Sequence, residues 1–448
     1  MRIDTPLLPL LRAFGLVLVT GMLGTTASAD AQTPLTLSDA MARARTDTAG
    51  ARAMTAAAGE ATARITQARS AFFPRIDLTE SVQRGNQPVY VFSTLLSQRR
   101  FTAANFDIQN LNHPPPETNI RTGVVFTQQV YDGGMTRLTV RAAELQRDMA
   151  DLDSAAGAQD RALIAARAFV RVVQLESLDR ANAAAVAAAE SDLDRTRRRR
   201  DVGLVTDADV LALEVHLADV RQRQIAAGGD LMVARLDLAD AVGLPLDRAI
   251  VIVTPRPSTD PVDANALARQ ALAARPERRQ SALRLELAEN GRRLARSAFL
   301  PRIGVQAAWE FNGATWAEQR SAWTVGTTVA LNVFNGFGDR GRMTEAQQAE
   351  SRAAADREQL ERRIEVEVRG AAARVAAARA GETVGRAALV QARESQRIIR
   401  ERYDAGLATV TDVLRAAEAV LDAEARATAA ETNVILETVA LDRATGQL

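Results

Sequence analysis

Residues 68–76 (ARSAFFPRI) return almost unchanged as residues 295–303 (ARSAFLPRI), and residues 203–209 (GLVTDAD) return as residues 406–412 (GLATVTD). The first pair is offset by 227 positions and the second by 203, so the first copy holds 24 more residues. The extra residues lie between Pro74 and Gly123. A repeat of this length, with the same motifs in the same order, predicts a duplicated fold.

The N-terminus predicts a secretory signal peptide over residues 1–29. An apolar run at residues 13–24 is followed by the small-residue cleavage site Ala27–Ala29. That run is too short for a transmembrane helix, which needs about 20 apolar residues, and no later segment approaches this length. The sequence has no cysteine for a lipid anchor. We therefore expect an exported chain without a transmembrane helix.

The composition predicts long, closely packed helices. The 448 residues are 47% hydrophobic and 25% charged, with long stretches rich in alanine, leucine, glutamate and arginine. The net charge is +1, and loss of the signal peptide, with two arginines and one aspartate, brings it to zero. This balance does not favour a nucleic-acid partner.

Each copy contains two segments in which apolar and polar residues alternate, which predicts strands with one apolar and one polar face. The predicted strands lie near residues 76–84 and 123–131 in the first copy, and near 303–312 and 325–334 in the second. Lengths of about nine residues suit tilted strands in a bilayer. Trp309, Trp316 and Trp323 all fall in the second strand pair, as in an aromatic girdle.

Two proline-free segments, residues 134–200 and 338–404, predict helices about 100 Å long, with apolar residues at heptad spacing as in coiled coils. Each is followed by a glycine and a shorter predicted helix, over 206–242 and 409–444. Two further helices are expected at 35–71 and 262–298. The domain organisation is therefore a first repeat at 30–248, a connector at 249–261 and a second repeat at 262–448.

Four amphipathic strands cannot close a membrane barrel, because small closed barrels need about eight. An open edge in lipid leaves unpaired backbone groups. Several chains must therefore contribute strands to one barrel. The alternative, a soluble sandwich, is disfavoured because the strands are few and the helices far too long for such a core.

The order of these motifs resembles the TolC family of outer-membrane efflux proteins. The resemblance rests on the P-R-I strands, on YDGG at 131–134 and FNGFG at 334–338, and on RYDAGLATVTDVL at 402–414. It covers the whole mature chain. It implies a mainly α fold with a small transmembrane β part, a homotrimer in outer-membrane lipid, and a helical tunnel across the periplasm. The implied partners are a periplasmic adaptor and an inner-membrane pump.

The resemblance also assigns candidate site residues. The hairpin turns at Gly203–Leu204 and Gly406–Leu407 would form the periplasmic tip, and Asp209, Tyr403 and Asp412 match positions at its closed end. Arg415 stands where many relatives carry a second carboxylate, so an Asp–Arg network across the trimer axis is one reading. The other is that Thr206-x-x-Asp209 and Thr409-x-x-Asp412 are helix capping boxes. The arginine run at 197–200 is a solvated helix end or, less favoured, an adaptor contact.

Prolines and glycines mark the predicted junctions between strands and helices. Pro74 and Pro301 precede strands, and Gly133, Gly134, Gly336 and Gly338 follow strands. The spacing G-x-G-x-x-G at 336–341 is not read as a dinucleotide site, because the strand before it alternates and the helix after it is several times too long. His113 and His216 have no partner at metal-ligand spacing, and no cofactor or metal is expected.

The sequence therefore predicts a passive trimeric exit duct, gated at its tip by adaptor and pump, and not an enzyme. A periplasmic adaptor or other helical scaffold is the alternative, disfavoured by the two copies and the membrane-type strands. Drug efflux and protein or peptide secretion stay open, and metal export is less favoured. The insertion, within residues 85–122, would lie outside the cell and either narrows the mouth or covers the barrel rim.

Overall fold

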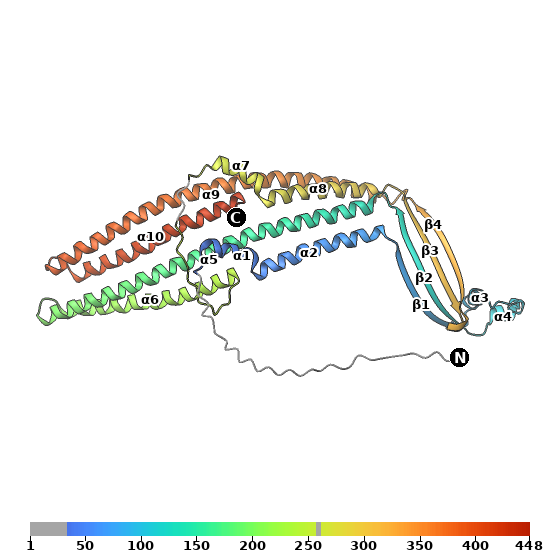
Figure 1. The fold of residues 1–448 in the computed structure, drawn as a ribbon, viewed down its shortest axis with the longest axis horizontal. Helices are drawn as coiled ribbons and strands as arrows, with labels where there is room; N and C mark the ends of the chain where they lie inside the picture. Colours follow the sequence, from blue (N-terminus) through green and yellow to red (C-terminus); the bar gives the residue numbers. More distant parts are fainter. Residues whose placement is uncertain (1–33, 257–260) are drawn as a thin grey trace, which may run out of the picture.

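A computed structural model describes residues 34–256 and 261–448, so the predicted signal peptide and part of the predicted connector lie outside the described residues. Two helical hairpins run side by side toward a single sheet at one end of an elongated molecule (Figure 1). The elements are α1 (Leu37–Thr46), α2 (Ala49–Arg69), η1 (Ser70–Phe72), β1 (Arg75–Gly85), α3 (Pro88–Ser97), η2 (Ala103–Phe106), α4 (Ile108–Asn112), β2 (Glu117–Tyr131), α5 (Met135–Asp201), α6 (Asp207–Val242), α7 (Ala264–Ala274), α8 (Pro276–Ser297), β3 (Arg302–Gly313), η3 (Trp316–Glu318), β4 (Arg320–Ala330), α9 (Gly338–Asp404) and α10 (Val410–Thr445).

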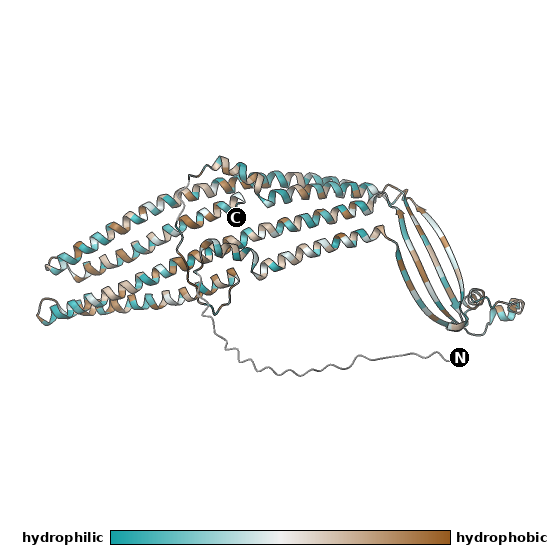
Figure 2. Cartoon of the chain, viewed as in Figure 1, coloured by the Kyte–Doolittle hydropathy of each residue, from teal (hydrophilic) through white to brown (hydrophobic). Residues whose placement is uncertain are grey.

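The two hairpins have equal dimensions. Helices α5 and α9 each have 67 residues, and α6 and α10 each have 36. Apolar and polar residues are interspersed along all four helices (Figure 2). Each helix also has a set of buried residues, as expected for helices with a buried seam and a solvated face. The mainly α fold class with a small sheet is confirmed.

The predicted single helices at 35–71 and 262–298 are wrong, because each is broken into two. Thr48 ends the first: its backbone is extended, and its side chain accepts a hydrogen bond from the backbone N–H of Ala51 as the N-cap of α2. Pro276 ends the second, because a residue before proline avoids the helical region, and Arg275 is extended. In both copies, a glycine at the end of the last helix packs on this break: Gly243 on Asp47, and Gly446 on Arg275.

The four strands form one antiparallel sheet in the order β1-β2-β3-β4. Strand β2 begins at Glu117, before the predicted 123, because it pairs with β1 as far as Gly85. Strand β4 covers 320–330 and not the predicted 325–334, because β3 begins after Pro301 and offers no backbone partner beyond Ala330. Strands β1 and β4 are the two edges of the sheet.

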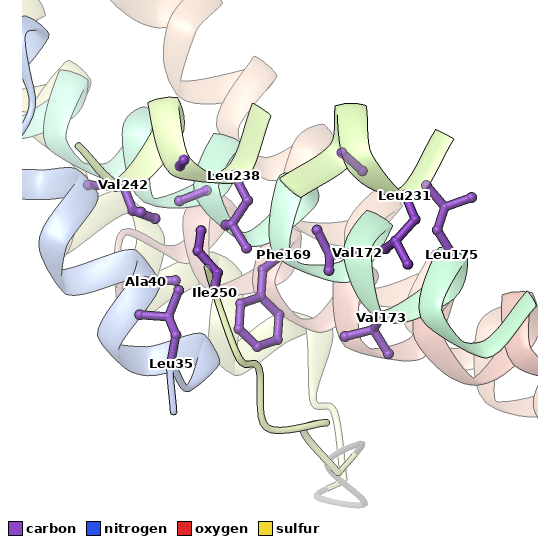
Figure 3. Close-up of a cluster of buried hydrophobic side chains, with 14 residues drawn as sticks. Leu35, Ala40, Phe169, Val172, Val173, Leu175, Leu231, Leu238, Val242 and Ile250 are labelled. Atoms are coloured by element: carbon purple, nitrogen blue, oxygen red, sulfur yellow. The ribbon is translucent and has the colours of Figure 1, made fainter. Parts of the chain in front are cut away.

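The largest buried cluster lies midway along the molecule, where α1, α5 and α6 meet the segment after α6. Phe169 is fully buried there beside Leu238 and Val242 (Figure 3). An isolated parallel bridge joins Leu35 to Ile252 over the same core. This cluster holds the short helices against the long hairpin.

Candidate functional site

The sheet has one exposed apolar face and one polar face. The register aligns Leu78, Val124, Trp309 and Trp323 in one row across all four strands. Leu78 is 73% exposed, Trp309 54% and Trp323 71%. Even-numbered residues of β1, even-numbered residues of β2 up to the bulge after Gln129, and odd-numbered residues of β3 and β4 lie on this face. The opposite residues, including the ion pair Arg121–Glu310, make up the polar face. A contiguous exposed apolar surface of this kind indicates contact with lipid or another chain.

The junction from β2 to α5 is a tight turn of two glycines. Gly133 has a φ of +69° and Gly134 one of +85°. A Cβ atom on Gly133 would lie 2.9 Å from the Cβ of Leu300, whereas one on Gly134 would meet nothing within 4 Å. The carboxylate of Asp132 accepts hydrogen bonds from the backbone N–H groups of Gly134 (2.9 Å) and Thr136 (2.7 Å). Burial acts to raise the pKa of Asp132, but a hydrogen bond from the Thr136 hydroxyl and the two backbone hydrogen bonds outweigh it and lower the pKa below its ordinary value.

The second junction differs in detail. Gly336 has a φ of +66°, but the next residue in the left-handed region is Phe337 at +67°, and Gly338 is already the first residue of α9. Gly338 therefore lies at the junction itself, and the left-handed turn is completed one position earlier. Pro74 and Pro301 lie immediately before β1 and β3.

The two hairpin turns at the far end have the same geometry. Gly203 and Gly406 both have a φ of +74°. The N–H of Leu204 donates to the carbonyl of Arg199 (2.9 Å), and the N–H of Leu407 to that of Arg402 (2.8 Å), which closes each long helix. The leucine side chains are 67% and 68% exposed.

Asp209 and Asp412 take part in capping boxes. Asp412 accepts hydrogen bonds from the backbone N–H (2.9 Å) and hydroxyl (2.7 Å) of Thr409, and Asp209 makes the same two contacts with Thr206. The bonds from Thr409 lower the pKa of Asp412, and the charge of Arg415 acts in the same direction. Capping therefore occupies one oxygen of each carboxylate and leaves the rest of the group free for other contacts.

Tyr403 joins the two hairpins. Its side chain, 8% exposed, lies in a buried cluster with Leu193, Leu213 and Val410. Its hydroxyl lies 3.2 Å from that of Thr196 on α5, which is 1% exposed. The guanidinium of Arg199 lies 4.8 Å from the centre of the tyrosine ring and donates to the Tyr403 carbonyl (3.0 Å).

The four predicted gate residues do not form one network within a chain. Among the described residues, Tyr403 bonds to Thr196 and Arg199, whereas the two aspartates bond to their own turns. Arg415 is exposed. Further contacts between the hairpins have no signal in the sequence. They are Arg195–Asp404 (3.0 Å), Arg400–Asp192 (2.9 Å), Arg223–Glu418 (2.7 Å) and His216–Glu418 (3.6 Å).

These contacts bear on the arginine run at 197–200, which was interpreted as a solvated face. Arg197, Arg198 and Arg200 are exposed, and Arg197 pairs with Glu214 of α6 at 2.7 Å. Arg199 is partly buried and contacts α9. The many arginines beside the turn were the only sequence signal for these ion pairs, and spacing alone does not identify a partner on another helix.

Within residues 34–256 and 261–448, no helix is both long enough and apolar enough to cross a membrane. The same described residues contain no cluster of three or more potential metal ligands.

The comparisons with known proteins agree with this architecture. The family model described as outer membrane efflux protein matches residues 41–244 and 267–447. Outer membrane protein TolC of Vibrio cholerae is 22% identical over 394 residues, 86% of this chain and 84% of that relative. Outer membrane efflux protein BepC of Brucella suis is 24% identical over 343 residues, 74% of each chain.

Two solved structures share the fold. The Campylobacter jejuni CmeC outer membrane channel has a TM-score of 0.77 at 16% identity, over 92% of this chain and 85% of that one. The outer membrane protein VceC of Vibrio cholerae has a TM-score of 0.74 at 20% identity, over 92% and 96%. The chain therefore belongs to the outer membrane efflux protein family: it is a non-enzymatic efflux duct of the outer membrane whose long helices extend into the periplasm.

Proposed function

We propose that three copies of this chain close into one passive exit duct. The observation that carries the proposal is a sheet with an exposed apolar face and two free edges, β1 and β4. Each unpaired backbone group in lipid costs several kcal/mol, so the edges must be paired. Pairing β4 of one copy with β1 of the next closes a barrel of about twelve strands from three copies.

The helical part supports the same assembly. Leu211, Val215, Ile225 and Met232 of α6 are between 60% and 72% exposed and fall on heptad positions of one face. A separate row on α6, including Leu213 and Leu217, packs against the hairpin's own core. A second apolar seam at heptad spacing is what a helix needs to pack against a neighbouring copy.

The far end of the helices is proposed as the gate and docking site. Helices of 67 residues reach about 100 Å from the barrel, so the turns lie deep in the periplasm. The exposed Leu204 and Leu407 would contact a periplasmic adaptor, which couples the duct to an inner-membrane pump. Around the trimer axis, Asp209, Asp412 and Arg415 would form the constriction, and Tyr403 would hold the two hairpins of each chain together.

The assembly is tested by the mass of the purified protein in mild detergent and by its conductance in planar bilayers. A trimer that conducts ions through single channels is the expected result. A monodisperse monomer without channel activity would overturn the proposed duct.

A further inference from the structure

Residues 86–116, here called the insert, form a small folded unit between β1 and β2. It contains α3, η2 and α4 and lies at the end of the sheet remote from the helices (Figure 1). The rings of Phe92, Phe101 and Phe106 pack edge to face, with centroids 4.8 and 5.1 Å apart. In the second copy, residues 314–319 connect the equivalent strands. A hairpin of this kind can therefore close without the insert.

The insert is bound to the polar face of the sheet. The side chain of Gln98, 2% exposed, donates to the carbonyl of Thr118 (2.8 Å) and to the amide oxygen of Asn119 (3.0 Å). Asn119 in turn donates to the side chain of Asn312 on β3 (2.8 Å), which is 3% exposed. Asn119 and Asn312 belong to the polar-face set, because they alternate with the apolar residues of β2 and β3. The C-terminal end of α3 thus covers the part of the polar face that is remote from the long helices.

The insert also reaches both edges of the sheet. The hydroxyl of Tyr90 donates to the carbonyl of Gln83 on β1 (2.9 Å). The guanidinium of Arg99, whose φ is +57°, donates to the carbonyl of Ser321 on β4 (3.0 Å). One insert therefore spans all four strands of its own chain.

The shorter loop turns to the opposite face. The side chain of Gln319 donates to the hydroxyl of Thr122 (3.1 Å), and Thr122 pairs with Phe311 in the apolar-face set. The two external loops of the chain therefore lie on different sides of the sheet. This difference provides a matched control for the insert.

We infer that the three inserts of the proposed trimer meet inside its outer opening and narrow it. The shorter loop, residues 314–319, lies at the rim of the opening. This inference rests on the proposed trimer, in which the polar face lines the lumen. Twelve strands about 4.8 Å apart and tilted by about 40° form a ring about 25 Å across. A helix is about 10–12 Å thick with its side chains, so one helix on each third of the wall reaches close to the axis.

The free surface of the insert carries four exposed large apolar side chains among polar residues, and these can make a contact with its own copies. Val89 is 73% exposed, Leu96 49%, Phe106 65% and Ile108 70%. The geometry assigns to these residues a contact with the same residues of the other two inserts. Burying them at the axis would remove four large apolar side chains from water.

The contact between inserts is tested by cysteine cross-linking of the full trimer. The natural sequence has no cysteine, so the single variants Phe106→Cys and Ile108→Cys give a clean background. With a short bis-maleimide on whole cells, both variants should form covalent dimers. Ala317→Cys, on the loop that turns to the apolar face, is the control and should stay monomeric. Trimers in mild detergent without cross-linking of either insert variant would overturn the inference and leave the proposed duct standing, whereas absence of trimers would overturn both.

The restriction of the mouth is tested separately from the periplasmic tip. Thr127→Cys places a thiol on the polar face near the inner end of β2, below the insert. On intact cells, a small impermeant maleimide should label it quickly, and a bulky polymer-linked maleimide should label it only slowly. Replacing residues 86–116 with residues 314–319 should make labelling by the bulky reagent several-fold faster and leave labelling by the small reagent unchanged. Equal labelling by the bulky reagent with and without the insert would overturn the restriction.

Discussion

Replacing Tyr403 with phenylalanine should loosen the contact between the two hairpins at the tip. The change removes the hydroxyl that lies 3.2 Å from Thr196, while the ring keeps its place beside Arg199, 4.8 Å away. The packing in the buried cluster is retained, so the variant should fold. The perturbation is therefore confined to one polar contact between α5 and α9.

The expected size follows from the burial of that contact. A hydrogen bond in a protein contributes about 1 kcal/mol net, and Thr196, at 1% exposed, has no access to water that could replace it. If the three chains of the proposed trimer open together, the closed state loses about 3 kcal/mol. Because about 1.4 kcal/mol corresponds to a tenfold change, the open population should rise by about 100-fold.

Single-channel recording of the purified trimer in planar bilayers measures this change as open probability. Thr196→Val should have a similar effect, and the double variant should add little to either, as expected for two partners of one contact. Asp412→Ala separates capping from gating. Loss of a cap alone would lower the thermal stability of α10 and leave the open probability unchanged, whereas loss of a carboxylate from the proposed constriction would also raise the open probability. Wild-type open probability in folded trimers of both Tyr403→Phe and Thr196→Val would refute the role of this contact in closing the duct.

Four further outcomes are expected. Gly133→Ala should lower the yield of folded protein in the outer membrane far more than Gly134→Ala, since only the first meets a leucine side chain, at 2.9 Å. Burial alone would raise the pKa of Glu277, but hydrogen bonds from Arg275 and Arg443 lower it to about 2. The thermal stability of the wild-type protein should therefore fall as the pH drops from about 4.5 to 2, and Glu277→Gln should make this fall less steep. Asp442→Asn should act oppositely and stabilise the protein at neutral pH, because burial raises the pKa of Asp442 and the fold loses stability as this group ionises. Gly406→Pro should reduce export at normal protein levels, because its φ of +74° and its N–H donor are both lost; unchanged export would contradict a role for the turn.

The long elements were predictable because their signals are periodic and extend over many residues. A proline-free heptad pattern places α5 and α9 within one residue of the observed ends, and strict alternation locates β1 and β3. The breaks between the short helices were not found, because they depend on local events. One is the capping by Thr48, and the other is the single Pro276 within an otherwise helical pattern.

The site was predictable only where its chemistry is local. The capping boxes follow from Thr-x-x-Asp spacing, and the structure has them at both turns. The contact between Tyr403 and Thr196 joins residues 207 positions apart, and a single sequence contains no signal for such a pair. The faces taken by the two external loops likewise depend on side-chain hydrogen bonds, such as that of Gln98 to β2, which no spacing rule gives.

The two copies have remained alike where the assembly needs equivalent parts and have diverged elsewhere. The tip turns, the lengths of the long helices and the glycine that packs on each helix break are the same in both copies. A ring built from two hairpins per chain needs this equivalence, because unequal hairpins would not end at one level. The outer loops carry no such constraint, since each strand pair is already closed by β pairing. An insertion there costs the fold little, so the first copy could acquire a folded unit over the polar face while the second kept a short turn on the apolar face.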